Sequence, residues 1–155
     1  KGVPEITKSE TMQQIRDLVK EDPQAIWLVA DMAYPATNIP AMAGADCLNT
    51  TQTYPQKTRW EMLDPEGEYE DIYNRYCHIR ASLGSKTMLE LVSTDYVEVT
   101  LSPEDLKKLN IRYIVSTNDF DEKIAAGTTN IFTDSGIEFQ KYYEGTQLSI
   151  YGCVY

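Results

Sequence analysis

The strongest constraint on the fold is a continuous apolar run over residues 25–30, AIWLVA, which is flanked by turn residues. A run of this length without polar alternation is typical of a β-strand that is covered on both faces. Residues 111–115, IRYIV, form a second candidate for such a strand. Before the first run, apolar residues recur at helical spacing as far as about Lys20. A helix followed by a buried strand is the beginning of an α/β layer, so the sequence predicts a layered α/β fold.

The rest of the chain combines helical and β-strand patterns. Short helices are predicted over residues 58–63 and 66–76, and a further helix is predicted to start at Ser102 with Pro in its first turn. Strands are predicted over residues 78–83, 87–92 and 95–101, a pattern compatible with a meander, and over residues 137–143 and 148–155, joined as a hairpin. We therefore expect an α/β (mixed α+β) fold: a single compact domain with a central mixed sheet, flanking helices and a C-terminal antiparallel hairpin, the strand order being left open.

Two segments show no clear periodicity. Residues 31–56 are interrupted by Pro and Gly but carry several large apolar residues, which predicts an ordered loop packed on the core. Residues 119–130 are polar, with Gly127 and two threonines, and are predicted to be a surface excursion.

Charge and hydropathy exclude several classes of partner. Fourteen Lys and Arg residues against twenty-four Asp and Glu residues give a net charge of −10. Binding to nucleic acid or to an anionic membrane surface requires clustered basic residues, so neither is expected. No apolar run approaches the roughly 20 residues of a membrane-spanning helix, so this segment is not expected to insert into a membrane. Residues 1–155 are expected to be one soluble domain, and the strand-like end at Tyr155 suggests a fragment of a larger protein.

The usual catalytic and cofactor motifs are absent from the sequence. No glycine-rich phosphate loop, no CxxC pair and no GxSxG elbow occurs, and there is a single histidine. We therefore predict no cofactor, no metal ligands and no catalytic residues. The three cysteines, Cys47, Cys77 and Cys153, are expected to be small buried hydrophobic residues, although one disulfide with one spare thiol stays open.

Residues 60–78 contain the densest group of aromatic and polar side chains. Aromatic rings beside carboxylate and amide groups suit a carbohydrate, because rings cover the apolar C–H face of a sugar while polar groups bind its hydroxyls. This segment and the preceding loop give a set of predicted glycan contacts: Asn49, Tyr54, Trp60, Asp64, Tyr69, Tyr73, Asn74, Arg75 and His78.

Two other interpretations of these residues remain open. The aromatic side chains of residues 60–78 are also explained as the buried face of a helix, and full burial of both Trp60 and Tyr73 would contradict glycan contact by them. A pair of carboxylates would suit a carbohydrate-active hydrolase, with Asp31, Asp64 and Asp71 as candidates. Asp31 directly follows the first buried strand, where α/β folds often place ligand-binding groups.

Several phrases of the sequence together resemble a known group of proteins. They are NIPAMAG at residues 38–44, LNTTQTYP at 48–55, WEMLDPEG at 60–67, YEDIYNRY at 69–76 and LNIRYIVS at 109–116. Over residues 5–155 the chain resembles the C-terminal extracytoplasmic domain of multi-spanning bacterial membrane proteins that are similar to GT-C-type glycosyltransferases.

The resemblance implies a location and a role. It implies a domain on the extracytoplasmic face of a bacterial cell membrane, held there by the transmembrane part of a parent protein. Because the catalytic acids of such proteins lie in loops between membrane helices, this domain would be a non-catalytic accessory that contacts cell-wall glycan or the membrane part of its parent. A free-standing hydrolase and a purely structural interaction domain are the alternatives.

Overall fold

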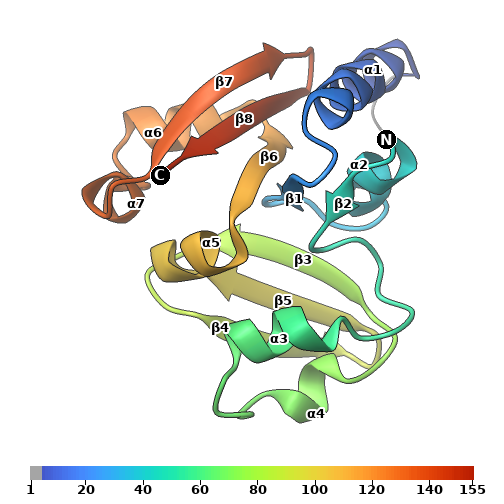
Figure 1. Ribbon diagram of the computed structural model, residues 1–155, viewed down its shortest axis with the longest axis vertical. Helices are drawn as coiled ribbons and strands as arrows, with labels where there is room; N and C mark the ends of the chain where they lie inside the picture. The colour runs from blue at the N-terminus through green and yellow to red at the C-terminus, as the bar shows by residue number, and fades with distance from the viewer. Residues whose placement is uncertain (1–4) are drawn as a thin grey trace.

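Residues 5–155, which the computed structural model describes with side chains from residue 10 onward, contain two β-sheets (Figure 1). The five-stranded sheet has the order β2-β1-β6-β8-β7 and the three-stranded sheet the order β3-β5-β4. The strands are β1 (Ile26–Val29), β2 (Asp46–Cys47), β3 (His78–Leu83), β4 (Met88–Ser93), β5 (Tyr96–Leu101), β6 (Ile111–Thr117), β7 (Glu138–Glu144) and β8 (Leu148–Val154). The predicted mixed α/β fold with a C-terminal hairpin is confirmed, with a second sheet in place of one central sheet.

Both sheets are mixed. In the larger sheet β1 is parallel to β2 and β6, while β8 is antiparallel to β6 and β7. In the smaller sheet β3 is parallel to β5, and β4 is antiparallel to β5 at the edge. The predicted meander is therefore wrong, because in a meander β3 would pair with β4. The apolar residues explain the order: the strand with alternating buried residues, β5, takes the centre, whereas β4 is exposed at all but one position.

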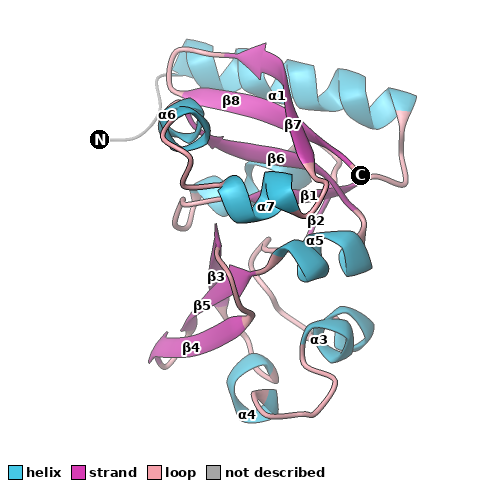
Figure 2. Ribbon diagram, turned by 90° about the vertical axis from the view of Figure 1, so that its left-hand side faces the viewer, coloured by secondary structure: helices cyan, strands magenta, loops and turns pink. Residues whose placement is uncertain are grey.

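Helices cover both faces of the larger sheet. The helices of the described residues are α1 (Glu5–Glu21), α2 (Ile39–Met42), α3 (Lys57–Leu63), α4 (Glu70–Tyr73), α5 (Pro103–Leu109), α6 (Asp119–Ala125) and α7 (Asn130–Asp134), with a short 3-10 helix, η1 (Ala36–Asn38); α3 and α4 lie by the smaller sheet. Figure 2 shows α1 along one face of the sheet and α7 on the other. Within the described residues, no helix is both long and apolar enough to cross a membrane.

The first apolar run is buried on both faces, as predicted. Trp27 and Val29 pack in a cluster with Ile15 of α1, whereas Leu28 and Ala30 belong to the cluster on the opposite side of the sheet. Successive strand residues point to opposite faces, so an uninterrupted apolar run is what a strand with two covered faces requires.

The polar segment after β6 differs from the prediction of a surface excursion. Residues 119–130 form α6 and the beginning of α7, and the side chain of Phe120 is buried, as is that of Phe132 shortly beyond. Each helix buries one large aromatic residue, and α6 also packs Ile124 against the core, while most of their other residues are partly or fully exposed. One buried residue in a single short turn or two leaves too weak a periodic signal to be recognised. The predicted helix over residues 66–76 is likewise reduced to α4, which has four residues.

The predicted helix start at Ser102 is confirmed. The Ser102 hydroxyl accepts a hydrogen bond from the Asp105 N–H at 3.3 Å, and the Asp105 carboxylate accepts one from the Ser102 N–H at 2.8 Å. This reciprocal capping box satisfies two backbone donors that the first helical turn leaves unpaired. At the other end, Asn110 takes a left-handed conformation with φ 53° and ends α5. Local chemistry therefore sets both ends of this helix, and the Thr87 hydroxyl also donates to the capping carboxylate at 2.6 Å.

A buried asparagine joins the two sheets. Asn49 is fully buried; its side-chain amide accepts a hydrogen bond from the Val29 N–H at 2.9 Å and donates one to the Val29 carbonyl at 2.8 Å. The same amide nitrogen reaches the carbonyl of Ile79 in β3 at 3.4 Å. The prediction of Asn49 as a glycan contact is wrong, because its polar atoms are used within the protein and lie out of reach of solvent.

Replacing Asn49 by Leu tests whether these hydrogen bonds stabilise the contact between the sheets. The variant leaves the N–H and carbonyl of Val29 buried without partners, so the free energy of unfolding should fall by about 2–5 kcal/mol in a urea titration. Asn74→Leu, at an exposed asparagine, is the matched control and should change stability by no more than about 0.5 kcal/mol. Equal effects of the two substitutions would contradict a joint at Asn49.

Candidate functional site

The aromatic residues at the centre of the predicted glycan surface are core residues. Trp60 and Tyr73 are 2% and 4% exposed, and their rings stack with centroids 5.0 Å apart and planes 7° from parallel. Burial raises the pKa of the Tyr73 hydroxyl above its ordinary value. By the criterion stated above, glycan contact by Trp60 and Tyr73 is wrong, because both rings are covered by α3, α4 and the sheet beneath them.

A buried glutamine organises this aromatic pair. Gln52 accepts a hydrogen bond from Trp60 Nε1 at 2.6 Å, and its amide nitrogen donates to the carbonyls of Tyr73 at 2.6 Å and Arg75 at 2.8 Å. The backbone of Gln52 also pairs with that of Cys77, N–H to carbonyl in both directions. Gln52 is not among the residues predicted from the sequence, because a lone polar residue in a loop carries no signal until its partners are brought together.

Asp64 is also a structural residue. Its buried carboxylate accepts hydrogen bonds from the N–H groups of Glu68 at 3.0 Å and Tyr69 at 2.8 Å, which closes the turn between α3 and α4. Tyr69 itself is partly buried against the main core. The prediction of Asp64 as a glycan contact is therefore wrong, since both carboxylate oxygens are committed to the backbone.

The remaining predicted residues reach the surface. Tyr54 is 83% exposed and Asn74 is exposed as well. Arg75 is half-buried, and its guanidinium donates to the carbonyls of Asp71 and Thr94. The structure therefore divides the predicted set into a buried half that supports the fold and an outer half that solvent can reach.

A cluster of tyrosines surrounds the single histidine. The His78 ring lies 4.1 Å from that of Tyr34, 5.5 Å from that of Tyr76 and 6.2 Å from that of Tyr96, centroid to centroid. Tyr34 and Tyr76 are 49% and 50% exposed, so two ring faces or edges of this aromatic cluster are open to solvent. Tyr34 comes from the loop after β1, and nothing in its local sequence signals that it will meet His78.

A pocket of about 220 Å³, which we call the loop pocket, opens beside this cluster. It is lined by Leu48, Thr50, Thr51, Gln52, Thr53, Tyr54, Gln56, Arg59 and Trp60. Arg59 at its rim forms an ion pair with Asp46 and donates to Gln56 Oε1 at 2.7 Å. A neighbouring hollow shares Gln56 and Arg59 with it, so the polar rim continues beyond the pocket.

Thr51 connects the loop pocket to the aromatic cluster. It lines the pocket, and its hydroxyl lies 3.1 Å from His78 Nδ1. Its backbone N–H is held by Asn38 Oδ1 at 2.9 Å, which fixes the loop. Threonine hydroxyls, a guanidinium, an amide and an exposed tyrosine therefore meet on one ordered segment beside an open aromatic cluster.

The possible metal ligands and the three thiols were predicted to have no role in a site. Among residues with described side chains, no group of His, Cys, Asp and Glu is arranged to hold a metal ion. The three thiols are free and buried, and burial raises the pKa of Cys47 and Cys77 to about 11 and that of Cys153 to about 12. The interpretation of the cysteines as buried hydrophobic residues is confirmed.

Comparison with known proteins gives one family. The family model described as "Domain of unknown function (DUF7654)" matches residues 5–155. No curated protein and no solved structure matches the chain significantly.

Gln52→Ala tests the buried hydrogen bonds that the Gln52 side chain makes to Trp60, Tyr73 and Arg75. Removing the amide leaves the Trp60 N–H and two carbonyls without partners, so the free energy of unfolding should fall by about 2–4 kcal/mol in chemical denaturation. Gln56→Ala, at an exposed glutamine four residues on, should be nearly neutral. An unchanged free energy of unfolding in Gln52→Ala would show that these hydrogen bonds do not stabilise α3 and α4.

The thiols give a second test. Because all three are buried with raised pKa values, their reaction with a disulfide reagent at pH 8 should be at least about 100-fold slower in the native protein than after denaturation. The release of the reagent's chromophore measures the rate. Fast reaction of one thiol in the folded protein would contradict its burial.

Proposed function

Since the chain belongs to the DUF7654 family of domains of unknown function, we propose its role from its own surface: a non-catalytic domain that contacts saccharide at the loop pocket. The observation that carries the proposal is the meeting of the loop pocket with the tyrosine cluster through Thr51 and His78. Residues of the predicted set that are buried have no part in it.

The chemistry of this surface suits sugar hydroxyls. Aromatic faces cover the apolar side of a sugar ring, and fixed hydroxyl, amide and guanidinium groups exchange hydrogen bonds with its rim. Tyr54 is the exposed ring at the pocket, while Thr53 and Arg59 supply the polar groups. The loop is ordered before any ligand arrives, so binding costs little conformational entropy. The net charge of −10 favours a neutral glycan over an acidic one.

A non-catalytic role is supported by the state of the carboxylates. Two that are buried, Asp64 and Asp105, are each used by backbone N–H groups. A glycosidase needs a pair of carboxyl groups free to meet the scissile bond, one of them with a raised pKa. The pKa of the Asp121 carboxyl is lowered instead by its hydrogen bond from Lys141. The free-standing hydrolase is therefore the weaker alternative.

The proposal also includes the location of the domain and the larger protein that it would belong to. The resemblance to extracytoplasmic domains of glycosyltransferase-like membrane proteins supports a domain held outside a bacterial cell membrane by the transmembrane part of its parent. There the loop pocket would hold an acceptor glycan near catalytic groups supplied by that part. The competing role is a structural interaction domain that binds no sugar.

An NMR titration with neutral cell-wall glycan fragments tests the proposal. Shifts should be confined to residues around Thr51, Tyr54 and Arg59, and Tyr54→Ala should weaken binding by about tenfold through loss of ring contact. Tyr142→Ala, at an exposed tyrosine of β7, is the matched control and should bind the glycan with the same affinity as the unsubstituted protein. Absence of any shift at millimolar ligand would favour the structural role, and an equal loss in both variants would contradict a site at Tyr54.

A further inference from the structure

The order of the strands creates a second place where a ligand is expected. In the five-stranded sheet β1 lies between its parallel neighbours β2 and β6, so the chain leaves β1 toward one side and later returns to the other. In open α/β sheets, ligands bind outside the carboxyl ends of the strands at the point where the direction of winding reverses. Here that point lies between the ends of β1 and β6.

A pocket of about 200 Å³ lies at this point, which we call the switch-point pocket. It is lined by Asp31, Leu83, Phe120, Lys123, Thr128 and Thr129. Asp31 follows β1, and Phe120 and Lys123 belong to α6, which follows β6. Leu83 of β3 closes the side toward the smaller sheet. Its size suits one small molecule, and none of its lining residues is shared with the loop pocket.

The backbone at Asp31 is held in an unusual conformation. Its φ is 62°, in the left-handed region that residues other than glycine rarely adopt and that costs free energy. Its N–H donates to the carbonyl of Ala81 at 2.8 Å, so the second sheet fixes the turn. A glycine would satisfy this backbone without strain, yet an aspartate stands here with its carboxylate in the pocket.

Asp31 forms an ion pair with Lys123 that leaves hydrogen-bonding atoms of both side chains available to a ligand. The pair joins Lys123 Nζ to Asp31 Oδ2. In the described part of the chain, Asp31 Oδ1 accepts no hydrogen bond, and Nζ donates no other. The side chains of Lys123 and Asp31 are 44% and 19% exposed, so a ligand from solvent would approach the pair from the lysine side. One acceptor and further N–H donors therefore stand side by side, with an apolar wall next to them.

We propose that the switch-point pocket binds one neutral sugar ring through two adjacent hydroxyls. One hydroxyl donates to Asp31 Oδ1, its neighbour accepts from Lys123 Nζ, and a C–H face of the ring lies against Leu83. A diol leaves the ion pair intact, whereas a zwitterion would have to separate it. This site goes beyond the proposed function, because it uses other residues and does not require sugar at Tyr54.

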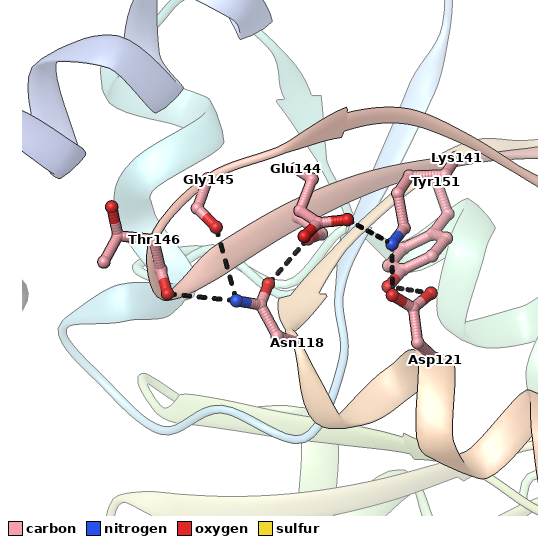
Figure 3. A network of polar contacts seen from close by, with 8 residues as sticks. Asn118, Asp121, Lys141, Glu144, Gly145, Thr146 and Tyr151 are labelled. Atoms are coloured by element: carbon pink, nitrogen blue, oxygen red, sulfur yellow. Dashed lines mark hydrogen bonds and ion pairs between the residues drawn. The ribbon is translucent and has the colours of Figure 1, made fainter.

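The opposite side of α6 provides a matched control. Asp121 pairs with Lys141 of β7 and accepts a hydrogen bond from the Tyr151 hydroxyl at 2.9 Å, while Asn118 bonds to the carbonyls of Gly145 and Thr146 (Figure 3). These contacts anchor α6 to the hairpin. Lys141→Ala therefore removes another Lys–Asp ion pair of the same helix without touching the switch-point pocket.

The experiment is an NMR titration of the whole chain with glucose, galactose and mannose, whose adjacent hydroxyls differ in orientation. At least one sugar should shift the amides of Asp31, Lys123 and Thr128. Asp31→Gly and Lys123→Ala should each raise the Kd by about tenfold or more, because each removes a charged hydrogen-bonding group. Asp31→Gly should keep its Tm, since glycine accepts the φ of this position, and Lys141→Ala should leave the Kd unchanged.

Several results would overturn the site. They are the absence of shifts at these amides with all three sugars, shifts produced by the amino acid glycine but by none of the sugars, and an unchanged Kd in both pocket variants. The two proposed sites are separated by position: Tyr54→Ala should not alter the shifts at Asp31. Shifts only around Tyr54 would support the loop pocket and contradict the switch-point pocket, and the reverse pattern would do the opposite.

Discussion

The hydrogen bonds of the buried Asn49 amide to the backbones of Val29 in β1 and Ile79 in β3 connect the two sheets. Strand β2 pairs with β1 only through Ile26 and Trp27, and Leu48 adds one bond to the Trp27 carbonyl. At the next pair the Asn49 side chain takes the place of a strand backbone, accepting from Val29 and donating to it. The main chain is thereby free to turn toward the second sheet without leaving Val29 unsatisfied.

The same segment then builds the second sheet's support and the loop pocket. Three residues after Asn49, Gln52 pairs its backbone with Cys77 and uses its side chain to hold Trp60 and two carbonyls. Residues that face inward from this crossing segment are structural, and the threonines between them face the pocket. The ordered surface we propose for saccharide is therefore the outer side of the connection that joins the sheets.

Aromatic and polar residues close together in sequence do not share one role here. Trp60, Asp64 and Tyr73 have the chemistry of a carbohydrate site, but the Trp60 N–H and the Asp64 carboxylate are hydrogen-bonded within the protein, and Tyr73 is buried. The open aromatic cluster instead combines His78 and Tyr76 with Tyr34, from more than forty positions earlier. Such a cluster depends on how the loop after β1 folds back toward β3, which no local pattern encodes.

The sequence by itself determined those features of the fold that have local causes. Apolar runs predicted β1 and β6, Pro103 in the first turn after Ser102 predicted the start of α5, and the alternating end of the chain predicted the hairpin. Tertiary structure alone decided the pairing of β3 with β5, the burial of Asn49 and Trp60, and the meeting of Asp31 with Lys123, ninety-two positions apart. The reason is physical: a hydrophobic period or a cap acts within one element, whereas strand order and buried polar pairing depend on which distant groups are left to satisfy one another.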